Sequence, residues 1–257
     1  MTYPLPNVSI DLAGQTALVT GASSGLGFRF AKVLAKCGAR VALAARRKDR
    51  LESLAEEIRQ DGGQAVPIQS DVSDSEQLIK AIRDTEIRLG VVTILVNNAG
   101  IPDAQRAHKM PVELIDQVID INVRAPFVLA CEVARRLIAA GKPGRIVNIA
   151  SAAAFDYGGG GAALYSVSKA AVVRMTETLA VEWARNMINV NAIAPGAFAS
   201  EMMDGMLNRI GDVTQQFPRK RLGDPAQLDS TLLYLVSPAS DAVTGTCIRV
   251  DDGQYRR

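Results

Sequence analysis

The sequence predicts an α/β fold in which a doubly wound parallel sheet of about seven strands carries helices on both faces. Three observations support this prediction: short apolar stretches alternate with helical patterns, turn-forming residues separate them, and 257 residues suit one large domain. Strands that alternate with helices pair in parallel, because each helix carries the chain back across the sheet. We therefore expect a single domain over residues 1–257.

The expected strands are short, apolar and bounded by turn residues, which is typical of strands buried on both faces. They cover residues 16–20, 40–44, 65–68, 92–96, 144–150, 187–193 and 245–250. Helical patterns cover residues 28–37, 48–60, 74–89, 111–140, 164–184 and 225–236. We expect the long helix that starts near Pro111 to be irregular around 120–123.

Charge and hydropathy argue against nucleic-acid and membrane partners. The net charge of +2 gives the molecule no overall field for a polyanion, so any anion site must be local. No apolar run reaches the ~18 residues of a membrane span, and the N-terminus lacks the basic and apolar regions of a signal peptide. We expect a cytoplasmic protein.

Cysteine and histidine usage indicates neither disulfides nor a metal centre. The three cysteines, Cys37, Cys131 and Cys247, are odd in number and far apart, which favours free buried thiols in a reducing compartment. The single histidine, His108, has no partner one helical turn away. A metal site and a histidine-based catalytic triad are therefore both disfavoured.

A glycine-rich turn separates the first strand from the first helix. Gly21, Gly25 and Gly27 have a G-x-x-x-G-x-G spacing in the segment G-A-S-S-G-L-G. Backbone N–H groups and the helix dipole bind phosphate at such a place. Gly21 would permit the tight turn, Gly25 the approach of a pyrophosphate, and Gly27 the packing of helix on strand. The pattern predicts a dinucleotide site.

The residues after the second strand bear on which dinucleotide binds. An acidic residue there would bind the ribose 2′-hydroxyl of NAD, whereas arginine accommodates the 2′-phosphate of NADP. The chain has Ala45 in the acidic position, followed by Arg46 and Arg47. We expect NADP (NADPH) to be preferred, mainly through Arg46, with NAD possible. A solvated helix start is the alternative interpretation of Arg47.

Polar or turn-forming residues follow each of the first six expected strands. They are the glycine turn, Arg46, Asp71, Asn98, Ser151 and Pro195. Parallel strands end at one edge of their sheet, and ligands bind in the crevice outside that edge. We therefore expect one site that collects all six strand ends.

Ser151 and the helix after it predict proton transfer. Tyr165 and Lys169 are four residues apart in a helical segment, so they lie on one face. Free tyrosine titrates near ~10, and a neighbouring cation stabilises the phenolate and lowers that pKa. The Ser151 hydroxyl could hold a carbonyl or alcohol oxygen. The alternative is an ordinary surface pair, because such spacings are common and weak.

These motifs occur in the order that is typical of the short-chain dehydrogenases/reductases (SDRs). They are T-G-A-S-S-G-L-G at 20–27, D-V at 71–72, N-N-A-G at 97–100, Asn122 in I-N-V, Ser151, Y-S-V-S-K at 165–169 and A-P-G at 194–196. The chain resembles, over nearly its whole length, the branch of this family with chains of similar size. It is most similar to 3-oxoacyl-carrier-protein reductases. The resemblance implies a Rossmann-type domain and an oxidoreductase.

The resemblance also implies a role for each catalytic residue. Tyr165 is similar to the general acid/base, and Lys169 to the residue that lowers its pKa and binds the nicotinamide ribose. Ser151 resembles the group that orients the substrate oxygen. Asn122 resembles the residue that holds a helix distortion and a water linking Lys169 to solvent. Hydride passes between the nicotinamide and the substrate carbon, while Tyr165 exchanges a proton with the substrate oxygen.

The binding residues follow from the same resemblance. The cofactor-binding set is Gly21, Ser23, Ser24, Gly25, Leu26, Gly27, Arg46, Arg47, Asp71, Val72, Asn98, Ala99, Gly100, Tyr165, Lys169, Pro195, Gly196, Phe198 and Ser200. The expected substrate contacts are Ser151, Tyr157, Tyr165 and Met202. The segment at about 198–221 has no clear period, and we expect it to cover the substrate. Its methionines suit either lid contacts or plain packing.

Three positions depart from the family's pattern. Ser151 and Tyr165 are one residue farther apart than is usual, and we place the extra residue in 158–161, where glycines tolerate unusual dihedrals. Ser24 stands where NADP-using relatives often have a basic residue, which weakens the NADP prediction. Ser200 stands where a threonine often holds the carboxamide, and its hydroxyl could do the same.

We expect an NADPH-dependent reductase of a ketone or of a 3-oxoacyl group. An NAD-dependent alcohol dehydrogenase of the same family is the alternative. A non-catalytic dinucleotide-binding sensor is a third, although such proteins usually lose the tyrosine or the lysine. The resemblance also implies a homotetramer (or homodimer) that uses the helices near 111–140 and 164–184.

Overall fold

Seven parallel strands form the sheet on which the described chain, residues 7–159 and 161–254, is built. In the computed structural model they are β1 (Thr16–Thr20), β2 (Arg40–Ala45), β3 (Gln64–Gln69), β4 (Ile94–Asn97), β5 (Gly144–Ile149), β6 (Ile188–Pro195) and β7 (Cys247–Val250). Their order across the sheet is β3-β2-β1-β4-β5-β6-β7, and each neighbouring pair is parallel. This arrangement confirms the doubly wound α/β fold.

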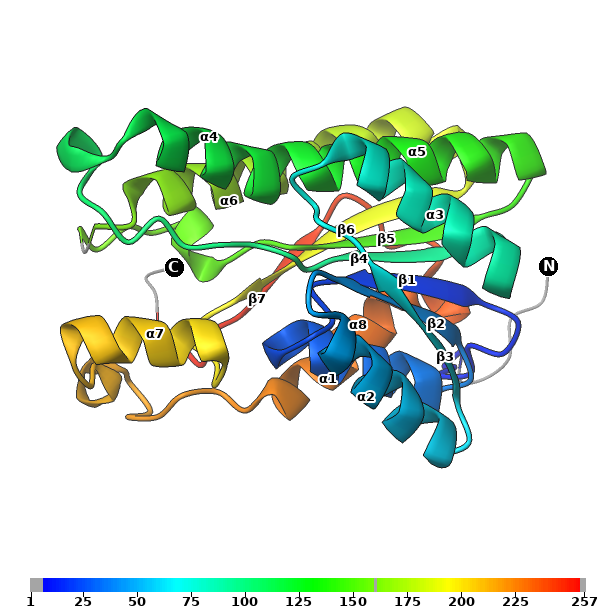
Figure 1. Ribbon diagram of the computed structural model, residues 1–257, viewed down its shortest axis with the longest axis horizontal. Helices are drawn as coiled ribbons and strands as arrows, with labels where there is room; N and C mark the ends of the chain where they lie inside the picture. Colours follow the sequence, from blue (N-terminus) through cyan, green and yellow to red (C-terminus); the bar gives the residue numbers. More distant parts are fainter. Residues whose placement is uncertain (1–6, 160, 255–257) are drawn as a thin grey trace.

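The helices cover both faces of the sheet, as Figure 1 shows. They are α1 (Gly25–Lys36), α2 (Lys48–Gln60), α3 (Ser75–Leu89), α4 (Val112–Ile119), α5 (Ala125–Ala140), α6 (Ala163–Trp183), α7 (Glu201–Ile210) and α8 (Asp229–Val236). In Figure 1, α1, α2 and α8 lie below the sheet, and α3, α4, α5 and α6 lie above it. The result is a single Rossmann-type domain of three layers.

Two apolar cores lie between the sheet and these layers. Successive strand residues point to opposite faces. Val19 of β1 therefore packs in the core between the sheet and α1, and Leu18 packs in the core on the opposite face of the sheet. Every residue of β1 is buried, as the central position of this strand requires. The continuous apolar character of the strands follows from this two-sided burial.

The strand order changes direction between β1 and β4. The chain runs from β1 outward to β3, then crosses back to pair β4 with the other side of β1. Loops that leave β1 and β4 therefore go to opposite faces, and a crevice opens between them at the carboxyl edge of the sheet. The helix α7 lies beyond this edge (Figure 1).

Three sequence-based expectations are met only in part. The pattern over 111–140 is α4 and α5 joined by a π-helical turn at Asp120–Arg124, which confirms the irregularity. The segment 198–221, where no period was clear, contains α7. The pattern over 225–236 is a 3₁₀ turn, Pro225–Leu228, followed by α8. Gly160, part of the glycine run at 158–161, lies outside the described residues.

The prediction of buried thiols was wrong, because the cysteines are less buried than expected. All three cysteines are free but only half-buried. Cys37 follows the last residue of α1, and Cys247 lies on the edge strand β7, positions where packing is one-sided. Burial still raises the pKa of the Cys247 thiol to about 12, so this group stays protonated at neutral pH.

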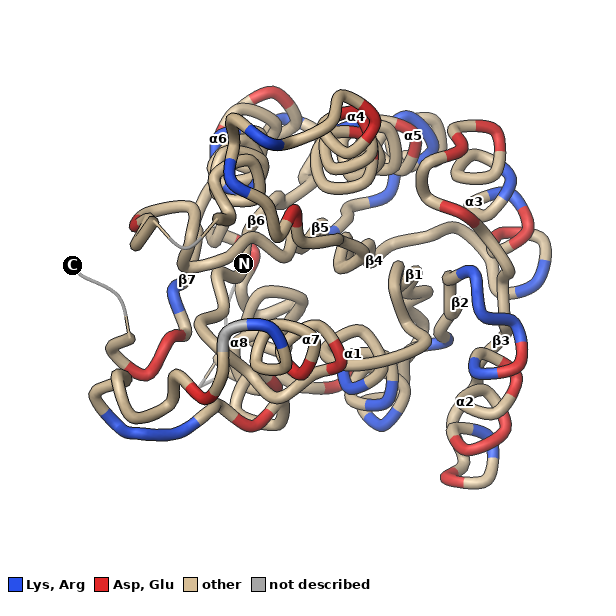
Figure 2. Tube along the Cα trace, turned by 60° about the vertical axis from the view of Figure 1, so that its left-hand side comes forward, with Lys and Arg blue, Asp and Glu red and all other residues tan. Residues whose placement is uncertain are grey.

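Charged residues of both signs alternate on the outer helices. Figure 2 shows acidic and basic residues interspersed along α2 and α3. Within residues 7–159 and 161–254, no helix combines the length and the apolar character that crossing a membrane requires.

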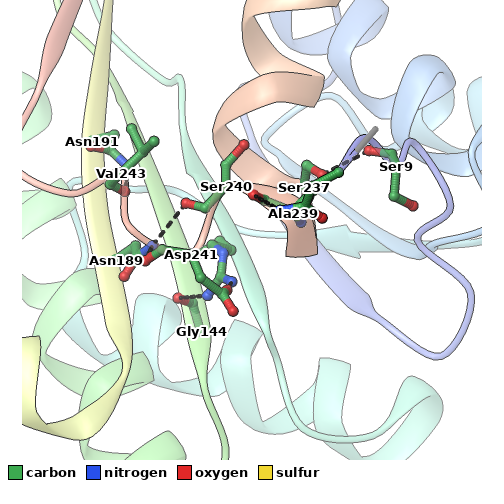
Figure 3. A network of polar contacts seen from close by, with 11 residues as sticks. Ser9, Gly144, Asn189, Asn191, Ser237, Ala239, Ser240, Asp241 and Val243 are labelled. Atoms are coloured by element: carbon green, nitrogen blue, oxygen red, sulfur yellow. Dashed lines mark hydrogen bonds and ion pairs between the residues drawn. The ribbon is translucent and has the colours of Figure 1, made fainter. Parts of the chain in front are cut away.

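A polar network ties together the amino edge of the sheet, opposite the crevice (Figure 3). Asn189, near the start of β6, donates its amide to the carbonyl oxygens of Asp241 (2.8 Å) and Ser240 (3.4 Å). Ser237 donates to the carbonyl of Ser9 at 2.7 Å. These bonds attach the segment after α8 to β6 and to the chain that precedes β1, at the end of the molecule far from the crevice.

Candidate active site

A cavity of about 590 Å³ opens at the carboxyl edge, where the loops after β1 to β6 meet. The predicted residues that line it are Gly21, Ser23, Ser24, Gly25, Leu26, Arg46, Arg47, Asp71, Val72, Asn98, Ala99, Gly100, Ser151, Tyr165, Lys169, Pro195, Gly196, Phe198, Ser200 and Met202. The structure therefore brings the six predicted strand ends to one place.

The glycine turn after β1 leads directly into α1. Gly21 and Gly25 have φ of +66° and +55°, a conformation that glycine adopts without the strain other residues incur. A Cβ at Gly27 would collide with the carbonyl oxygen of Gly21 and the amide of Asn98. The N-terminus of α1 thus borders the cavity, and Gly21 and Gly25 add no side chain there, which favours a phosphate site.

Thr20 joins the two loops that flank the crevice. Its hydroxyl oxygen accepts from the N–H groups of Asn98 (3.0 Å) and Ala99 (3.1 Å), in the loop after β4. The Asn98 side chain donates back to the carbonyl of Thr20 at 2.9 Å. These three bonds hold the end of β1 against the end of β4.

Arg47 is fixed at the mouth of the cavity, whereas Arg46 is exposed to solvent. Arg47 donates to the Ser24 hydroxyl at 2.8 Å and to the Ser23 hydroxyl at 3.0 and 3.1 Å. Ser24, which departs from the basic residue of many NADP-using relatives, therefore serves here as an acceptor for Arg47. Sequence reasoning favoured Arg46, and the structure shows that Arg47 is the guanidinium held by hydrogen bonds at this place.

A carboxylate from α7 forms an ion pair with the same arginine. Glu201, the first residue of α7, pairs with Arg47 at 3.0 Å and also with Arg50. These two guanidinium groups, Arg50 foremost, lower the pKa of Glu201 to about 2. Sequence reasoning missed Glu201, because it lies 154 residues from Arg47 and carries no motif.

The π-helical turn between α4 and α5 positions Asn122, which is buried with 1% exposure. Its side chain exchanges two hydrogen bonds with the backbone of Ile101, each 2.9 Å long. It also donates to the Ser168 hydroxyl at 3.1 Å. A π-helical turn widens the helix by one residue and is frequent at functional sites, and here it directs Asn122 toward α6.

Lys169 is a buried ammonium beside Tyr165. Its Nζ is 5.6 Å from the centre of the Tyr165 ring and donates to the carbonyl of Ile149 at 2.8 Å. Desolvation lowers the pKa of Lys169 to about 8. A Cβ at Gly100 would lie 3.3 Å from this nitrogen, so a residue without a side chain suits that position.

Ser151 also lines the cavity, at the position that caps the 3₁₀ turn Ala152–Ala154. Its hydroxyl oxygen accepts from the N–H of Ala153 at 3.2 Å. This bond uses a lone pair and leaves the hydroxyl proton available to a substrate oxygen.

A protein-family model described as short chain dehydrogenase matches residues 15–209. The chain belongs to the short-chain dehydrogenase family. Members are oxidoreductases that act on alcohol and keto groups with NAD(P), and this SDR is an enzyme of that kind.

Curated relatives cover this SDR almost end to end. A 3-oxoacyl-[acyl-carrier-protein] reductase of Rickettsia bellii is 35% identical over 245 residues, which are 95% of this chain and 98% of that protein. A 5-keto-D-gluconate 5-reductase of Escherichia coli is 34% identical over 250 residues, which are 96% of this chain and 98% of that protein.

Solved structures agree with the fold of this SDR. A short-chain type dehydrogenase/reductase from Mycobacterium marinum superposes with a TM-score of 0.92 at 36% identity, covering 96% of this chain and 98% of that one. An actinorhodin polyketide ketoreductase solved with NADPH gives a TM-score of 0.88 at 33% identity, covering 94% and 98%.

Three predicted residues of this SDR do not line the cavity. Gly27 packs behind the glycine turn, and Asn122 acts from behind Ile101. Tyr157 is 45% exposed in the segment before α6, and its contact with substrate stays a prediction. Among the described residues, no group of three or more His, Cys, Asp or Glu side chains could hold a metal ion.

Proposed function

We propose that this SDR reduces a ketone or a 3-oxoacyl group with NADPH, and that Tyr165 is its general acid. The observation that carries the proposal is the buried Lys169 ammonium, 5.6 Å from the centre of the Tyr165 ring at the cavity wall. A cation in that position favours the phenolate over the phenol. Tyr165 can therefore exchange its proton more readily than a free tyrosine, as general acid–base catalysis requires.

The residues around the cavity fit a bound dinucleotide. The glycine turn and the N-terminus of α1 would hold the pyrophosphate, since Gly21 and Gly25 line the cavity and project no side chain into it. Asp71 and Val72 would flank the adenine, and Ser200 would hold the carboxamide. When bound, the nicotinamide supplies the hydride that the carbonyl carbon receives.

Two arginines support a preference for NADPH. Arg46 and Arg47 both line the cavity after β2, and Ala45 stands where an acid would repel a phosphate. Arg47 already binds an anionic group, the Glu201 carboxylate, at 3.0 Å. A ribose 2′-phosphate would take the place of that carboxylate, because a guanidinium binds either group through two parallel N–H donors.

Proton transfer then follows from the side chains alone. The Ser151 hydroxyl donates a hydrogen bond to the carbonyl oxygen and orients it. The Tyr165 phenol gives its proton to the same oxygen as the carbon is reduced, and the product is a secondary alcohol. Lys169 stabilises the phenolate that remains until a proton from solvent restores the phenol. In the reverse direction the same groups remove the alcohol proton.

A second substrate class has one observation in its favour. Arg209 of α7 lines the cavity, and no hydrogen bond or ion pair holds its guanidinium within the described chain. A free guanidinium there suits a keto acid, whose carboxylate it would bind. The 5-keto-D-gluconate 5-reductase among the relatives acts, by its name, on such a compound.

A turnover assay tests the proposal. Oxidation of NADPH and NADH is followed with a 3-oxoacyl thioester, a cyclic ketone and a sugar keto acid, for the wild type and Tyr165→Phe. We expect turnover with NADPH and a loss of ~10²–10⁴-fold in kcat for Tyr165→Phe. Tight NADPH binding without turnover of any compound, and with no difference between the two proteins, would indicate a sensor. Preference for the keto acid, lost in Arg209→Ala, would indicate the second class.

We also propose that the chain assembles as a homotetramer, or as a homodimer, through α4, α5 and α6. Large apolar side chains stand exposed on these helices: Val112, Ile115, Ile119, Phe127, Val167 and Val181. Association of copies would remove them from water. Light scattering measures the mass directly. A monomeric wild type would contradict the proposal, and Phe127→Asp is expected to shift the assembly toward smaller species.

A further inference from the structure

The helix that carries Tyr165 begins without a cap of its own. The residue before α6 is Ala162, which has no side chain able to bond the first N–H groups of the helix. The run at 158–161 before it is made of glycine alone. The first four N–H groups of a helix have no acceptor within the helix. Tyr165 is the third residue of α6, so its N–H is one of the four.

A carboxylate from another part of the chain supplies the missing acceptor. Asp103, in the loop after β4, accepts from the Tyr165 N–H at 3.0 Å through Oδ2, across 62 residues of sequence. Its Oδ1 accepts from the N–H of Ala104 at 2.6 Å, and Ala104 has a φ of +53°. Asp103 is only 3% exposed and lies on the cavity wall. Both of its oxygens are thus engaged with backbone in a buried place.

The loop after β4 is also linked to Tyr165 through a chain of hydrogen bonds that passes through Asn122 and Ser168. Ile101 holds Asn122 by two hydrogen bonds, and Asn122 donates to the Ser168 hydroxyl. Ser168 in turn donates to the carbonyl oxygen of Tyr165 at 2.7 Å. The N–H of Tyr165 is therefore bonded directly by Asp103, and its C=O is linked to Ile101 indirectly, through Ser168 and Asn122. Through Asn98, that loop also joins the end of β1.

We propose that Asp103 is a positioning residue for Tyr165, an inference that rests on the proposed function. The Lys169 ammonium is fixed to β5 through Ile149, whereas Tyr165 lies in the first turn of α6, where helices fray. Asp103 holds that turn closed, and its negative charge also suits a helix N-terminus. Without the carboxylate, the phenol would spend time away from the ammonium, and misplacement of ~1 Å costs up to ~10²-fold in rate.

A second helix offers a matched control. Asp74 caps α3 from the adjacent position, and its Oδ1 accepts from the N–H groups of Glu76 (2.9 Å) and Gln77 (3.3 Å). It does not line the cavity. Asp103→Ala and Asp74→Ala remove the same kind of bond. Only the first is expected to disturb the chemistry.

The experiment compares kcat, NADPH affinity and melting temperature in Asp103→Ala, Asp103→Asn and Asp74→Ala. We expect kcat to fall about tenfold or more in Asp103→Ala, with NADPH affinity within about twofold of the wild type. Asp103→Asn keeps one acceptor oxygen and should restore part of the rate. Asp74→Ala should lower the melting temperature without changing kcat. An unchanged kcat in Asp103→Ala, or an equal loss in Asp74→Ala, would overturn the proposal.

A second measurement needs no turnover. Ultraviolet titration of each protein, minus that of its Tyr165→Phe counterpart, reports the pH at which the Tyr165 phenol ionises. We expect this pH to rise in Asp103→Ala and not in Asp74→Ala, because the phenol loses contact with the ammonium. If Asp103→Ala does not fold, Asp103→Asn gives the same test with a smaller shift. If the wild type is inactive but the ionisation pH of Tyr165 rises in Asp103→Ala, only the proposed function is contradicted. If the wild type is active and this pH does not rise in Asp103→Ala, the role of Asp103 is contradicted.

Discussion

The two edges of the sheet use polar side chains in opposite ways. At the amino edge, Asn189 and Ser237 are bonded to backbone carbonyls and lie outside the cavity lining (Figure 3). At the carboxyl edge, Ser151, Tyr165 and Lys169 line a cavity of about 590 Å³. The strand β6 contains both patterns, with Asn189 near its start and Pro195 at its end. Polar groups saturated by backbone stabilise a fold, whereas those that keep donors for a ligand serve chemistry.

Replacing Lys169 gives the sharpest test of this comparison. Lys169→Met should reduce kcat by about 10²-fold or more, since the phenolate loses its cation. Stability at neutral pH should not fall. Burial lowers the pKa of Lys169 from 10.5 to about 8, so unfolding takes up a proton between these values. Below that window the buried ammonium costs stability, and stability rises as the pH passes upward through it.

Urea unfolding at neutral pH and at pH about 10 measures this effect. The rise should be present in the wild type and absent in Lys169→Met. Loss of stability in Lys169→Met at neutral pH would show that this lysine is a structural group like those of the amino edge.

Cofactor binding separates the two arginines at the carboxyl edge. Arg47→Ala and Arg46→Ala should each weaken NADPH by roughly the 1.5–3 kcal/mol of a charged hydrogen bond, and NADH far less. Because Arg47 is held in place by Ser23 and Ser24, Arg47→Ala should weaken NADPH binding more than Arg46→Ala does. Fluorescence titration gives both dissociation constants. Equal affinity of the wild type for NADPH and NADH would refute the NADP preference.

At the amino edge, we expect a substitution to reduce stability and to leave kcat nearly unchanged. Asn189→Ala leaves the carbonyls of Ser240 and Asp241 without this donor, and should lower the free energy of unfolding by about 1–3 kcal/mol. The value of kcat should stay within about twofold of the wild type. Urea titration and the NADPH assay, run on one preparation, measure both. A large loss of kcat would show that the edges are coupled through β6.

The smallest effect is expected at Glu201. Glu201→Gln removes the charge that Arg47 and Arg50 bind, and so leaves both guanidinium groups to a phosphate. NADPH affinity should rise by up to about fivefold, because exposed ion pairs contribute ~0.2–1 kcal/mol. The gain should shrink at high salt, where such pairs are screened. Weaker NADPH binding in Glu201→Gln would indicate that the closed position of α7 helps to retain the cofactor.

The order of strands and helices could be predicted because it depends on local patterns. Buried strands are apolar throughout, helices have a period near 3.6, and parallel strands deliver their ends to one edge. The irregularity at 120–123 was also predicted, and it is the π-helical turn. Contacts between distant loops could not be predicted in this way. The Asp103–Tyr165 and Arg47–Glu201 pairs join residues 62 and 154 positions apart and belong to no motif.

The helix α7 was hidden for a different physical reason. Gly205 lies in its interior, where glycine disfavours a helix, and none of its described side chains is fully buried. Its apolar residues Met202, Met203, Met206 and Leu207 do recur at helical spacing, and this signal could have revealed the helix. The interior glycine and the short length of ten residues hid it among the turns on either side.

The bonds around Thr20 decide how this cavity can adapt. One hydroxyl accepts the amides of Asn98 and Ala99, and the Asn98 side chain donates back to the Thr20 carbonyl, so β1 and β4 cannot spread apart without breaking all three bonds. The carboxyl ends of β1 and β4, which border the cavity, are thereby held rigidly together. Room for longer or bulkier molecules would therefore come from movement of α7, whose Met202, Met203 and Met206 line the cavity.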